Sequence, residues 1–172
     1  MTTTTAVEMT KTMWTVTGSP IGDLRIVARG GSITAIEFSP FQASASGEPA
    51  GERVDDDFLL QRAVAQLAAY FARELKEFDL PLAPRGSDFQ QRVWKQLQGI
   101  GYGETASYGE IAQRLGMTSA GSRAVGLANG RNPIPVVIPC HRVIGADGTL
   151  TGYAGGLERK QVLLGLEQDV LF

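Results

Sequence analysis

The stretch YGEIAQRLGMTSAGSRAVGLANG, residues 108–130, has the pattern of two short helices joined by a brief turn. Ser107 precedes the first helix as its expected N-cap, and Gly116 follows the last apolar residue, where glycine commonly ends a helix. The second helix is expected over 119–130. Two helices of this length and separation have the dimensions of a helix-turn-helix motif.

The second of these helices carries little side-chain bulk, because six of its twelve residues are Gly or Ala. Each Gly costs roughly 1 kcal/mol of helix propensity. Small residues let one helix pack tightly against another, and they also let a helix enter the narrow minor groove of DNA. Arg123 is a long cation among these small neighbours and favours the nucleic-acid interpretation. The spacing alone leaves both interpretations open.

Two further helices are expected on either side of this motif. Ser87 and Gln90 match a capping box that opens a helix over 87–100, and GLERKQVLLGLEQ, residues 156–168, forms the last helix. Between the motif and the last helix, PVVIPC predicts a short apolar strand that leads into Cys140, and ADGT predicts a turn between small strands. The second half of the chain is therefore expected to be mainly helical.

The first half of the chain has a different pattern, and the change falls at LPLAPRGS, residues 80–87. Three short strands are expected over 11–16, 23–28 and 32–38, followed by a surface loop over 39–52 and a helix over 55–78 whose N-terminus suits the acidic run at 55–57. The predicted fold class is α+β. An N-terminal α/β domain with a small antiparallel sheet occupies 1–84, and a helical domain with the helix-turn-helix occupies 85–172.

Composition excludes several classes of protein. The chain has 172 residues, of which 43% are hydrophobic and 20% charged, as in ordinary globular proteins. No window approaches the ~18 consecutive apolar residues of a membrane span, and the N-terminus has no signal-peptide pattern, so a cytoplasmic location is expected. The single cysteine excludes an internal disulfide and a multi-thiolate zinc site.

The charge of the chain is uneven. Residues 1–84 carry 11 acidic and 7 basic side chains, whereas residues 85–172 carry 7 and 9. The formal net charge of -2 argues against binding nucleic acid by bulk electrostatics. Between Ser107 and Arg142, however, four arginines face one acidic residue, Glu110, which allows a small basic face.

The only cysteine, Cys140, stands directly before the only histidine, His141. A free thiol has a pKa near ~8.5, so a nucleophilic cysteine needs a base or a positive field. Neighbouring residues on a strand point to opposite sides, so this pair requires a bend in the chain or a water between the side chains. Glu167 is the candidate carboxylate for the second imidazole nitrogen. A Cys-His-Glu relay is one hypothesis, and a buried cysteine that serves only packing is the other.

The residues around Cys140 carry a family resemblance. GRNPIPVVI, PCHRVIG and GYAGGLERKQVLLGLE, together with YGETASYGEIAQRLG and SRAVGLANG, closely resemble the O6-alkylguanine-DNA alkyltransferases, also called methylated-DNA-protein-cysteine methyltransferases. The resemblance runs from about Asp88 to Glu167, and the first 80 residues resemble that family's variable N-terminal domain.

The resemblance implies a catalytic set. Cys140 would attack the alkyl carbon on guanine O6, and His141 would deprotonate it through a water, oriented by Glu167. Asn132 would hold the bend that carries the cysteine, and Tyr108 would donate to the guanine as it leaves.

The resemblance also implies contacts with DNA and with the flipped base. Arg123 would fill the space that the flipped base leaves, within a DNA-binding set of Tyr108, Ser122, Arg123, Ala124 and Arg131. Val143, Tyr153, Ala154 and Asn129 would line the substrate pocket. Ala154 stands where many members have serine, and Asn129 stands where some have a bulkier apolar residue.

The product of such a transfer is a thioether that water does not readily cleave, so the protein would act once and be consumed. The implied partner is double-stranded DNA containing alkylated guanine, with O4-alkylthymine as a second candidate substrate. No cofactor is implied, the structural zinc of some relatives is expected to be absent, and a monomer that can assemble cooperatively on DNA is expected.

Two other functions use the same residues. A Cys-His hydrolase or peptidase would use the pair with an oxyanion hole and would turn over. A non-catalytic module would bind alkylated DNA through the helix-turn-helix, and Cys140 would be incidental. A sequence-specific transcription factor fits least well, because the second helix of the motif offers few long side chains to read base edges.

Overall fold

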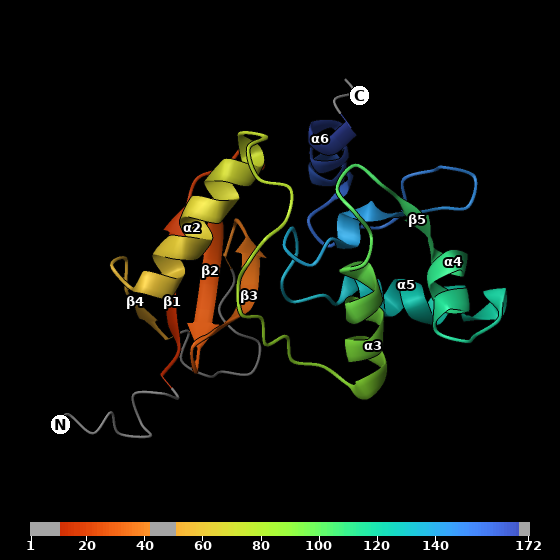
Figure 1. The fold of residues 1–172 in the computed structure, drawn as a ribbon, viewed down its shortest axis with the longest axis horizontal. Coiled ribbons are helices and arrows are strands. Elements are labelled where there is room, and N and C mark those ends of the chain that lie inside the picture. Colours follow the sequence, from red (N-terminus) through yellow and green to blue (C-terminus); the bar gives the residue numbers. More distant parts are fainter. Residues whose placement is uncertain (1–10, 42–50, 169–172) are drawn as a thin grey trace. The chain divides into compact units, whose positions relative to one another are not determined.

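The computed structural model describes residues 11–41 and 51–168, and the chain divides into two compact units, Met1–Pro84 and Arg85–Phe172 (Figure 1). The first unit contains β1 (Met13–Thr17), β2 (Leu24–Arg29), β3 (Ser32–Phe38), β4 (Glu52–Arg53) and α2 (Phe58–Phe71). The second contains α3 (Asp88–Leu97), β5 (Ala106–Ser107), α4 (Tyr108–Arg114), the 3-10 helix η1 (Ser119–Gly121), α5 (Ser122–Gly130), the 3-10 helix η2 (Cys140–Arg142), β6 (Val143–Ile144) and α6 (Leu157–Gln168).

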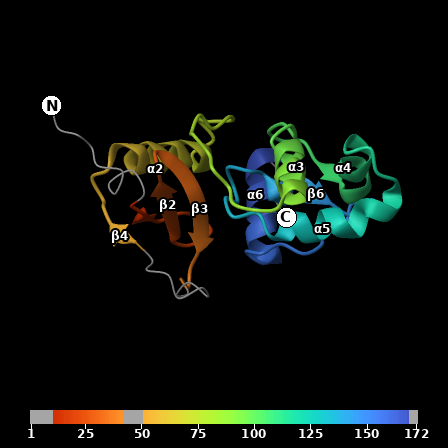
Figure 2. The same cartoon turned by 90° about the horizontal axis from the view of Figure 1, so that it is seen from below.

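The first unit is a sheet covered on one face by a helix. Within the described residues its strand order is β3-β2-β1-β4, and α2 packs across the sheet (Figure 2). Every second residue of β2 is buried, and so is the apolar side of α2, because a strand and a helix each turn one apolar face inward. The fully buried side chains Leu24, Ile26, Leu60 and Tyr70 make up much of this core.

The predicted strands and helix are present in this unit, with two corrections. The meander β1-β2-β3 is antiparallel as predicted, but β4 begins at Glu52, the last residue of the predicted loop, and pairs with β1 in parallel, so the sheet is mixed. The helix was predicted to reach residue 78 and ends at Phe71, since Arg73 has a φ of 63° that a helix cannot contain. Its N-cap is Asp57, which accepts from the Leu60 amide. Most of the predicted loop, 42–50, lies outside the described residues.

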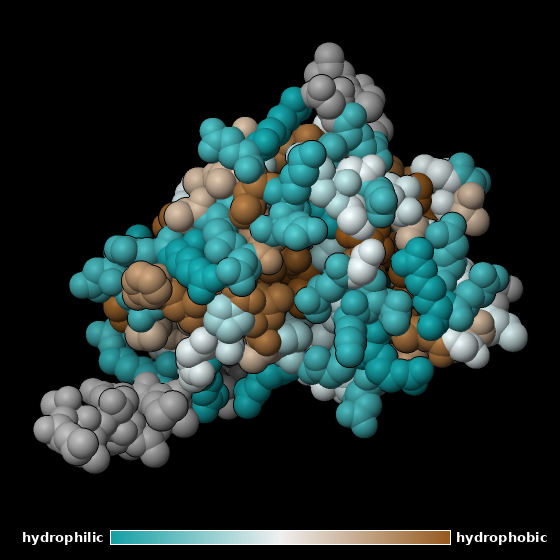
Figure 3. Space-filling model, in the orientation of Figure 1, coloured by the Kyte–Doolittle hydropathy of each residue, from teal (hydrophilic) through white to brown (hydrophobic). Residues whose placement is uncertain are grey.

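The second unit is mainly helical, and the α+β fold class is confirmed. The predicted capping box is present: Ser87 and Gln90 each accept a hydrogen bond from the other's backbone amide at the start of α3. The indole of Trp94 donates to the Ala128 carbonyl at 2.8 Å and joins α3 to α5. Position 86 has no room for a side chain, because a Cβ there would lie 2.3 Å from the Trp94 ring. Polar side chains cover much of the surface over α3 and α4 (Figure 3).

The helix-turn-helix consists of α4, η1 and α5. Ser107 caps α4 by accepting from the Glu110 amide, and Gly116, with a φ of 76°, follows the end of the helix. The predicted second helix is divided: its first three residues form η1, and α5 begins at Ser122.

The segment before the cysteine is not the strand that its apolar residues predict. Residues 134–138 form a turn, in which the Ile138 amide bonds to the Ile134 carbonyl at 2.9 Å and Val136 has a φ of 72°. The predicted turn at 146–149 is present, closed by the Gly145 amide on the Thr149 carbonyl. Its flanking strands do not form a hairpin, because β6 pairs in parallel with β5 instead.

No helix within 11–41 and 51–168 is long and apolar enough to cross a membrane. In the same ranges, no group of three or more His, Cys, Asp or Glu side chains is arranged to hold a metal ion.

Candidate active site

Cys140 lies at the start of the 3-10 helix η2, and Pro139 separates it from the turn at 134–138. Its side chain is almost fully buried, with 3% of the residue exposed. The 3-10 geometry supplies the bend that two adjacent residues need if both are to serve one site. The thiol therefore lies in the interior of the second unit, on a short helix that also carries the imidazole.

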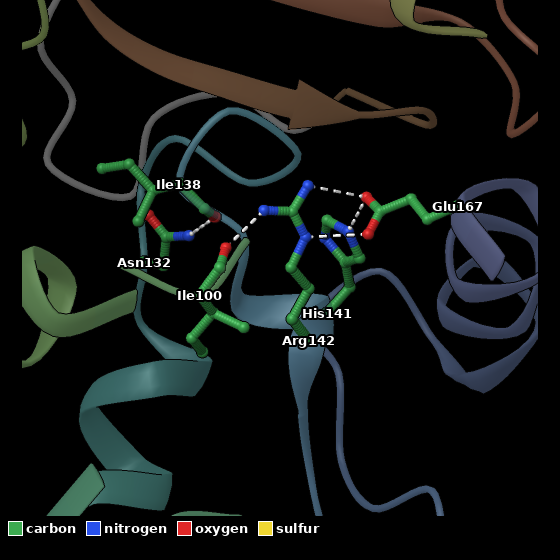
Figure 4. A network of polar contacts seen from close by, with 6 residues as sticks. All are labelled: Ile100, Asn132, Ile138, His141, Arg142 and Glu167. Atoms are coloured by element: carbon green, nitrogen blue, oxygen red, sulfur yellow. Dashed lines mark hydrogen bonds and ion pairs between the residues drawn. The ribbon is translucent and has the colours of Figure 1, made fainter. Parts of the chain in front are cut away.

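His141 is fully buried and forms a close pair with Glu167 of α6 (Figure 4). The distance between His141 Nε2 and Glu167 Oε2 is 2.6 Å. A carboxylate can only accept, so Nε2 carries the proton and Nδ1 of the neutral ring is an acceptor. Nδ1 has no hydrogen-bond partner among the described residues. The imidazole is thus held by one nitrogen and free to accept a proton at the other.

Arg142 holds the same carboxylate from a second side (Figure 4). Its Nε and Nη2 donate to Glu167 Oε1 and Oε2 at 2.8 and 3.0 Å, and its Nη1 donates to the Ile100 carbonyl at 2.6 Å. A buried carboxylate with a bidentate guanidinium partner is strongly favoured in its charged form. Arg142 thereby keeps Glu167 anionic for its contact with His141.

Burial sets the protonation states of the thiol and the imidazole. It raises the pKa of Cys140 to about 11, against the opposing effects of the Asn132 side chain and the Lys160 charge. It also lowers the pKa of His141 below its usual 6.5, more than the Glu167 hydrogen bond raises it, and the Arg142 charge lowers it further. At neutral pH the thiol is protonated and the imidazole is neutral, so ionising the sulfur requires a base such as His141.

Asn132 holds the turn that precedes the cysteine. Its Nδ2 donates to the Ile138 carbonyl at 2.7 Å, and its Oδ1 accepts from the Ile134 amide at 3.0 Å. One side chain thus satisfies both ends of the turn. This explains how Val136, a β-branched residue, is kept in the left-handed region that such residues rarely adopt.

Three of the four expected pocket residues are buried near the thiol. Asn129 donates from Nδ2 to the Cys140 carbonyl at 3.3 Å, while its Oδ1 has no partner among the described residues. Tyr153 is 9% exposed, and burial followed by the nearby Cys140 raises its pKa well above the usual 10. Val143 is fully buried, whereas Ala154 is exposed.

Lys160 is a fully buried residue that the sequence analysis missed. Its Nζ donates to the Val143 carbonyl at 2.6 Å and to the Thr151 carbonyl at 2.8 Å, so one ammonium joins both ends of the segment 143–151. Burial lowers its pKa to about 8, and Cys140 acts in the opposite direction. The spacing of seven residues between Lys160 and Glu167 places both on one side of α6, and this spacing was the available signal.

The residues expected to contact DNA lie on the helix-turn-helix. Tyr108, at the start of α4, accepts a hydrogen bond at its hydroxyl from Thr151 at 3.0 Å. Arg123 on α5 and Arg131 after it are exposed, while Ser122 and Ala124 are partly buried. Arg123 shares its side of α5 with Leu127, which is 64% exposed. Sequence analysis also missed Arg142 and Thr151.

Tight packing accounts for only some of the small residues in the predicted second helix: Ala128 is buried, and a Cβ added at Gly121 would lie 2.6 Å from the Met117 side chain. A Cβ added at Gly126 would lie 3.7 Å from the Tyr108 ring, an ordinary contact, and a Cβ at Gly130 would meet nothing within 4 Å. At Gly130, therefore, the missing side chain leaves open space outside the helix. This favours the interpretation in which α5 approaches a groove.

These features define a two-domain protein in which a cysteine-histidine-glutamate centre is built into a helix-turn-helix domain. Two family models match the chain: the DNA binding domain of 6-O-methylguanine DNA methyltransferase over residues 88–169, and the ribonuclease-like domain of the same family over residues 12–84. The chain belongs to this family, and the resemblance noted from its motifs is confirmed.

Curated relatives and solved structures agree with this assignment. A methylated-DNA–protein-cysteine methyltransferase of Mycolicibacterium paratuberculosis is 54% identical over 152 residues, which covers 87% of this chain and 88% of the relative. One from Methanosarcina acetivorans is 49% identical, with coverages of 87% and 94%. The crystal structure of the Mycobacterium tuberculosis O6-methylguanine methyltransferase aligns with a TM-score of 0.83 at 48% identity, covering 94% of this chain and 95% of that one. A Mycobacterium tuberculosis structure in complex with DNA aligns with a TM-score of 0.81 at 50% identity, with coverages of 91% and 93%.

Proposed function

We propose that this protein repairs DNA by transferring the alkyl group of O6-alkylguanine to Cys140 in a single, irreversible step. The observation that carries this proposal is the placement of the thiol directly before an imidazole whose Nε2 lies 2.6 Å from a buried carboxylate. Family membership supports the substrate, because the matching family model is that of 6-O-methylguanine DNA methyltransferase.

The proton leaves the thiol through His141. The Cys140 pKa of about 11 keeps the sulfur protonated at rest, and His141 Nδ1 is an acceptor without a partner in the described part of the chain. A water between Sγ and Nδ1 carries the proton to the ring. The imidazolium that results faces Glu167, which Arg142 keeps anionic.

The sulfur then attacks the alkyl carbon. The new bond joins Sγ to that carbon, the bond between the carbon and guanine O6 breaks, and guanine leaves with the electron pair. Tyr108 supplies a proton to the leaving base, and the proton held by His141 returns to Tyr108 through solvent. The product is a thioether on Cys140. Because nothing in the reaction restores the thiol, each molecule acts once.

The target base must leave the duplex before it can reach the sulfur of Cys140, a residue that is only 3% exposed. Extrusion of a nucleotide costs a few kcal/mol. We propose that α5 approaches the minor groove and that Arg123, the exposed cation on this helix, occupies the space left by the base. Ser122, Ala124 and Arg131 contact the strand around it, while Asn129, Val143, Tyr153 and Ala154 surround the extruded base.

The partner in this proposal is double-stranded DNA carrying O6-alkylguanine, with O4-alkylthymine as a second substrate. The protein acts as a monomer that can assemble cooperatively on DNA, and it works in the cytoplasm. All residues given a role in this proposal lie in the unit 85–172.

Release of guanine from free O6-benzylguanine tests the proposal. We expect one guanine per protein, then no more, with the benzyl group bound to Cys140. Continued release without an adduct would indicate a Cys-His hydrolase. A Cys140→Ser variant that retained all of the wild-type repair activity would indicate that the thiol is incidental.

A further inference from the structure

Thr151 makes a contact that neither its sequence position nor the proposed mechanism predicts. Its Oγ1 lies 3.0 Å from the Tyr108 hydroxyl, although the two residues are 43 positions apart. Thr151 belongs to the segment that follows the turn at 146–149, and Tyr108 begins α4. The contact therefore joins this segment to the helix-turn-helix.

A buried lysine side chain holds the backbone of Thr151 in place. Lys160, which is fully buried, donates to the Thr151 carbonyl at 2.8 Å and to the Val143 carbonyl at 2.6 Å. Since the carbonyl is fixed by a buried ammonium, the side chain of the same residue presents its hydroxyl from a defined position. The contact with Tyr108 thus rests on an anchored backbone rather than on the loop alone.

The direction of this hydrogen bond matters for the chemistry of Tyr108. A hydroxyl has one proton to donate and can accept with its lone pairs. When Thr151 donates, the phenol oxygen accepts and its own proton stays available for the leaving base. As Tyr108 gives up that proton, negative charge develops on its oxygen, and a hydrogen bond to a charged acceptor is stronger than one to a neutral acceptor.

We propose that Thr151 is a positioning residue for Tyr108, whose hydroxyl it orients toward the substrate and stabilises as the phenol releases its proton. This inference rests on the proposed function, since it needs Tyr108 to act as the donor to the leaving guanine. It adds a residue of the segment 143–151 to the reaction without any contact with the base.

The test compares single-turnover rate constants at saturating concentrations of a duplex that contains one O6-methylguanine. Thr151→Val removes the hydroxyl and keeps the shape and the backbone carbonyl. We expect this variant to react about five- to twentyfold more slowly, as for loss of one hydrogen bond to a developing charge. Thr151→Ser restores the hydroxyl and should react within about twofold of wild type. Both variants should bind the duplex with the wild-type Kd.

Two controls separate orientation of Tyr108 from a general effect on the segment. Thr149→Val removes the hydroxyl of a neighbouring threonine, which bonds to Asp147 at 2.7 Å, and should leave the rate constant unchanged. Tyr108→Phe removes the acceptor, so adding Thr151→Val to it should slow the reaction no further. Thermal unfolding of each variant verifies that it is folded.

The outcomes distinguish this inference from the proposed function. A wild-type rate for Thr151→Val, an equal loss in the Tyr108→Phe background, or a loss confined to Kd would overturn the role of Thr151 and leave alkyl transfer intact. Failure of the wild-type protein to acquire a methyl group on Cys140 would overturn the proposed function itself.

Discussion

His141 is a base whose protonation is set by opposing neighbours. Burial and the Arg142 charge lower its pKa below 6.5, while Glu167 raises it. The neutral form is the one that accepts a proton from Cys140. We therefore expect the rate constant for alkyl transfer to stay level as the pH falls to 6.5 and to decline only below it, by about tenfold per pH unit once the imidazole is mostly protonated.

The decline of the rate constant at low pH, the acid limb of the pH profile, is measured by quenching the reaction at successive times in buffers of different pH. Glu167→Gln removes the group that raises the His141 pKa, so its limb should lie at lower pH although its rate is lower throughout. The lowered pKa of His141 also makes the stability of the folded protein depend on pH. Because the folded-state pKa is depressed, the stabilisation is present above pH 6.5 and is lost as the pH falls through the folded-state value. A limb centred above 6.5 would contradict this assignment.

Arg142 is expected to matter for stability as much as for chemistry. Arg142→Met removes two hydrogen bonds from the buried Glu167 carboxylate and one from the Ile100 carbonyl. Leaving a buried charge without its partner costs about 3–5 kcal/mol, which denaturant unfolding will measure. Arg85→Met is the matched control at an exposed position and should change the free energy of unfolding by less than about 0.5 kcal/mol.

At the scale of elements, the capping box of α3 gives a local test. Ser87→Ala removes the acceptor for the Gln90 amide and should destabilise the protein by about 1 kcal/mol in denaturant unfolding. Ser87→Asn retains an acceptor and should be nearly neutral. Equal losses for the two variants would show that the side chain contributes something other than the cap.

The exposed side of α5 gives a functional test. Arg123→Ala should slow repair of methylated duplex DNA about tenfold, because the extruded base loses its replacement in the stack. It should leave the reaction with free benzylguanine unchanged, since no base is extruded there. Arg85→Ala, outside the motif, is the control for loss of a positive charge. Equal slowing with both substrates would place Arg123 in the chemistry rather than on the DNA.

Elements whose signals lie close together in the sequence could be predicted. The capping box at Ser87 and Gln90, the N-cap Ser107 and the stop at Gly116 each depend on neighbours within a few residues. The turn at 134–138 could not be predicted, because Asn132 holds it and an apolar run alone favours a strand. The parallel pairing of β5 with β6 joins segments far apart in the chain and left no local pattern.

The residues of the candidate site also divide into those that could be predicted from the sequence and those that could not. Cys140 and His141 could be proposed because each is the only residue of its kind in the chain, and Glu167 because the motif around it resembles a known family. Arg142, Lys160 and Thr151 were missed, because arginine, lysine and threonine are usually exposed and their importance here arises from burial or long-range contacts. The roles of the predicted site residues stay predictions until the variants above are measured.

At the scale of the whole molecule, the chain is a family member whose second unit carries every proposed functional residue. Reaction with a duplex that contains one O6-methylguanine should therefore methylate a single atom of that unit. The methyl group should remain after denaturation, because a thioether is covalent.

Mass spectrometry of the intact protein and of its peptides after incubation with this duplex tests the central claim most directly. We predict a gain of one methyl group per molecule, located on the peptide that contains Cys140, and no gain for Cys140→Ser. An unmodified Cys140 in protein that has removed the methyl group from the DNA would contradict the account.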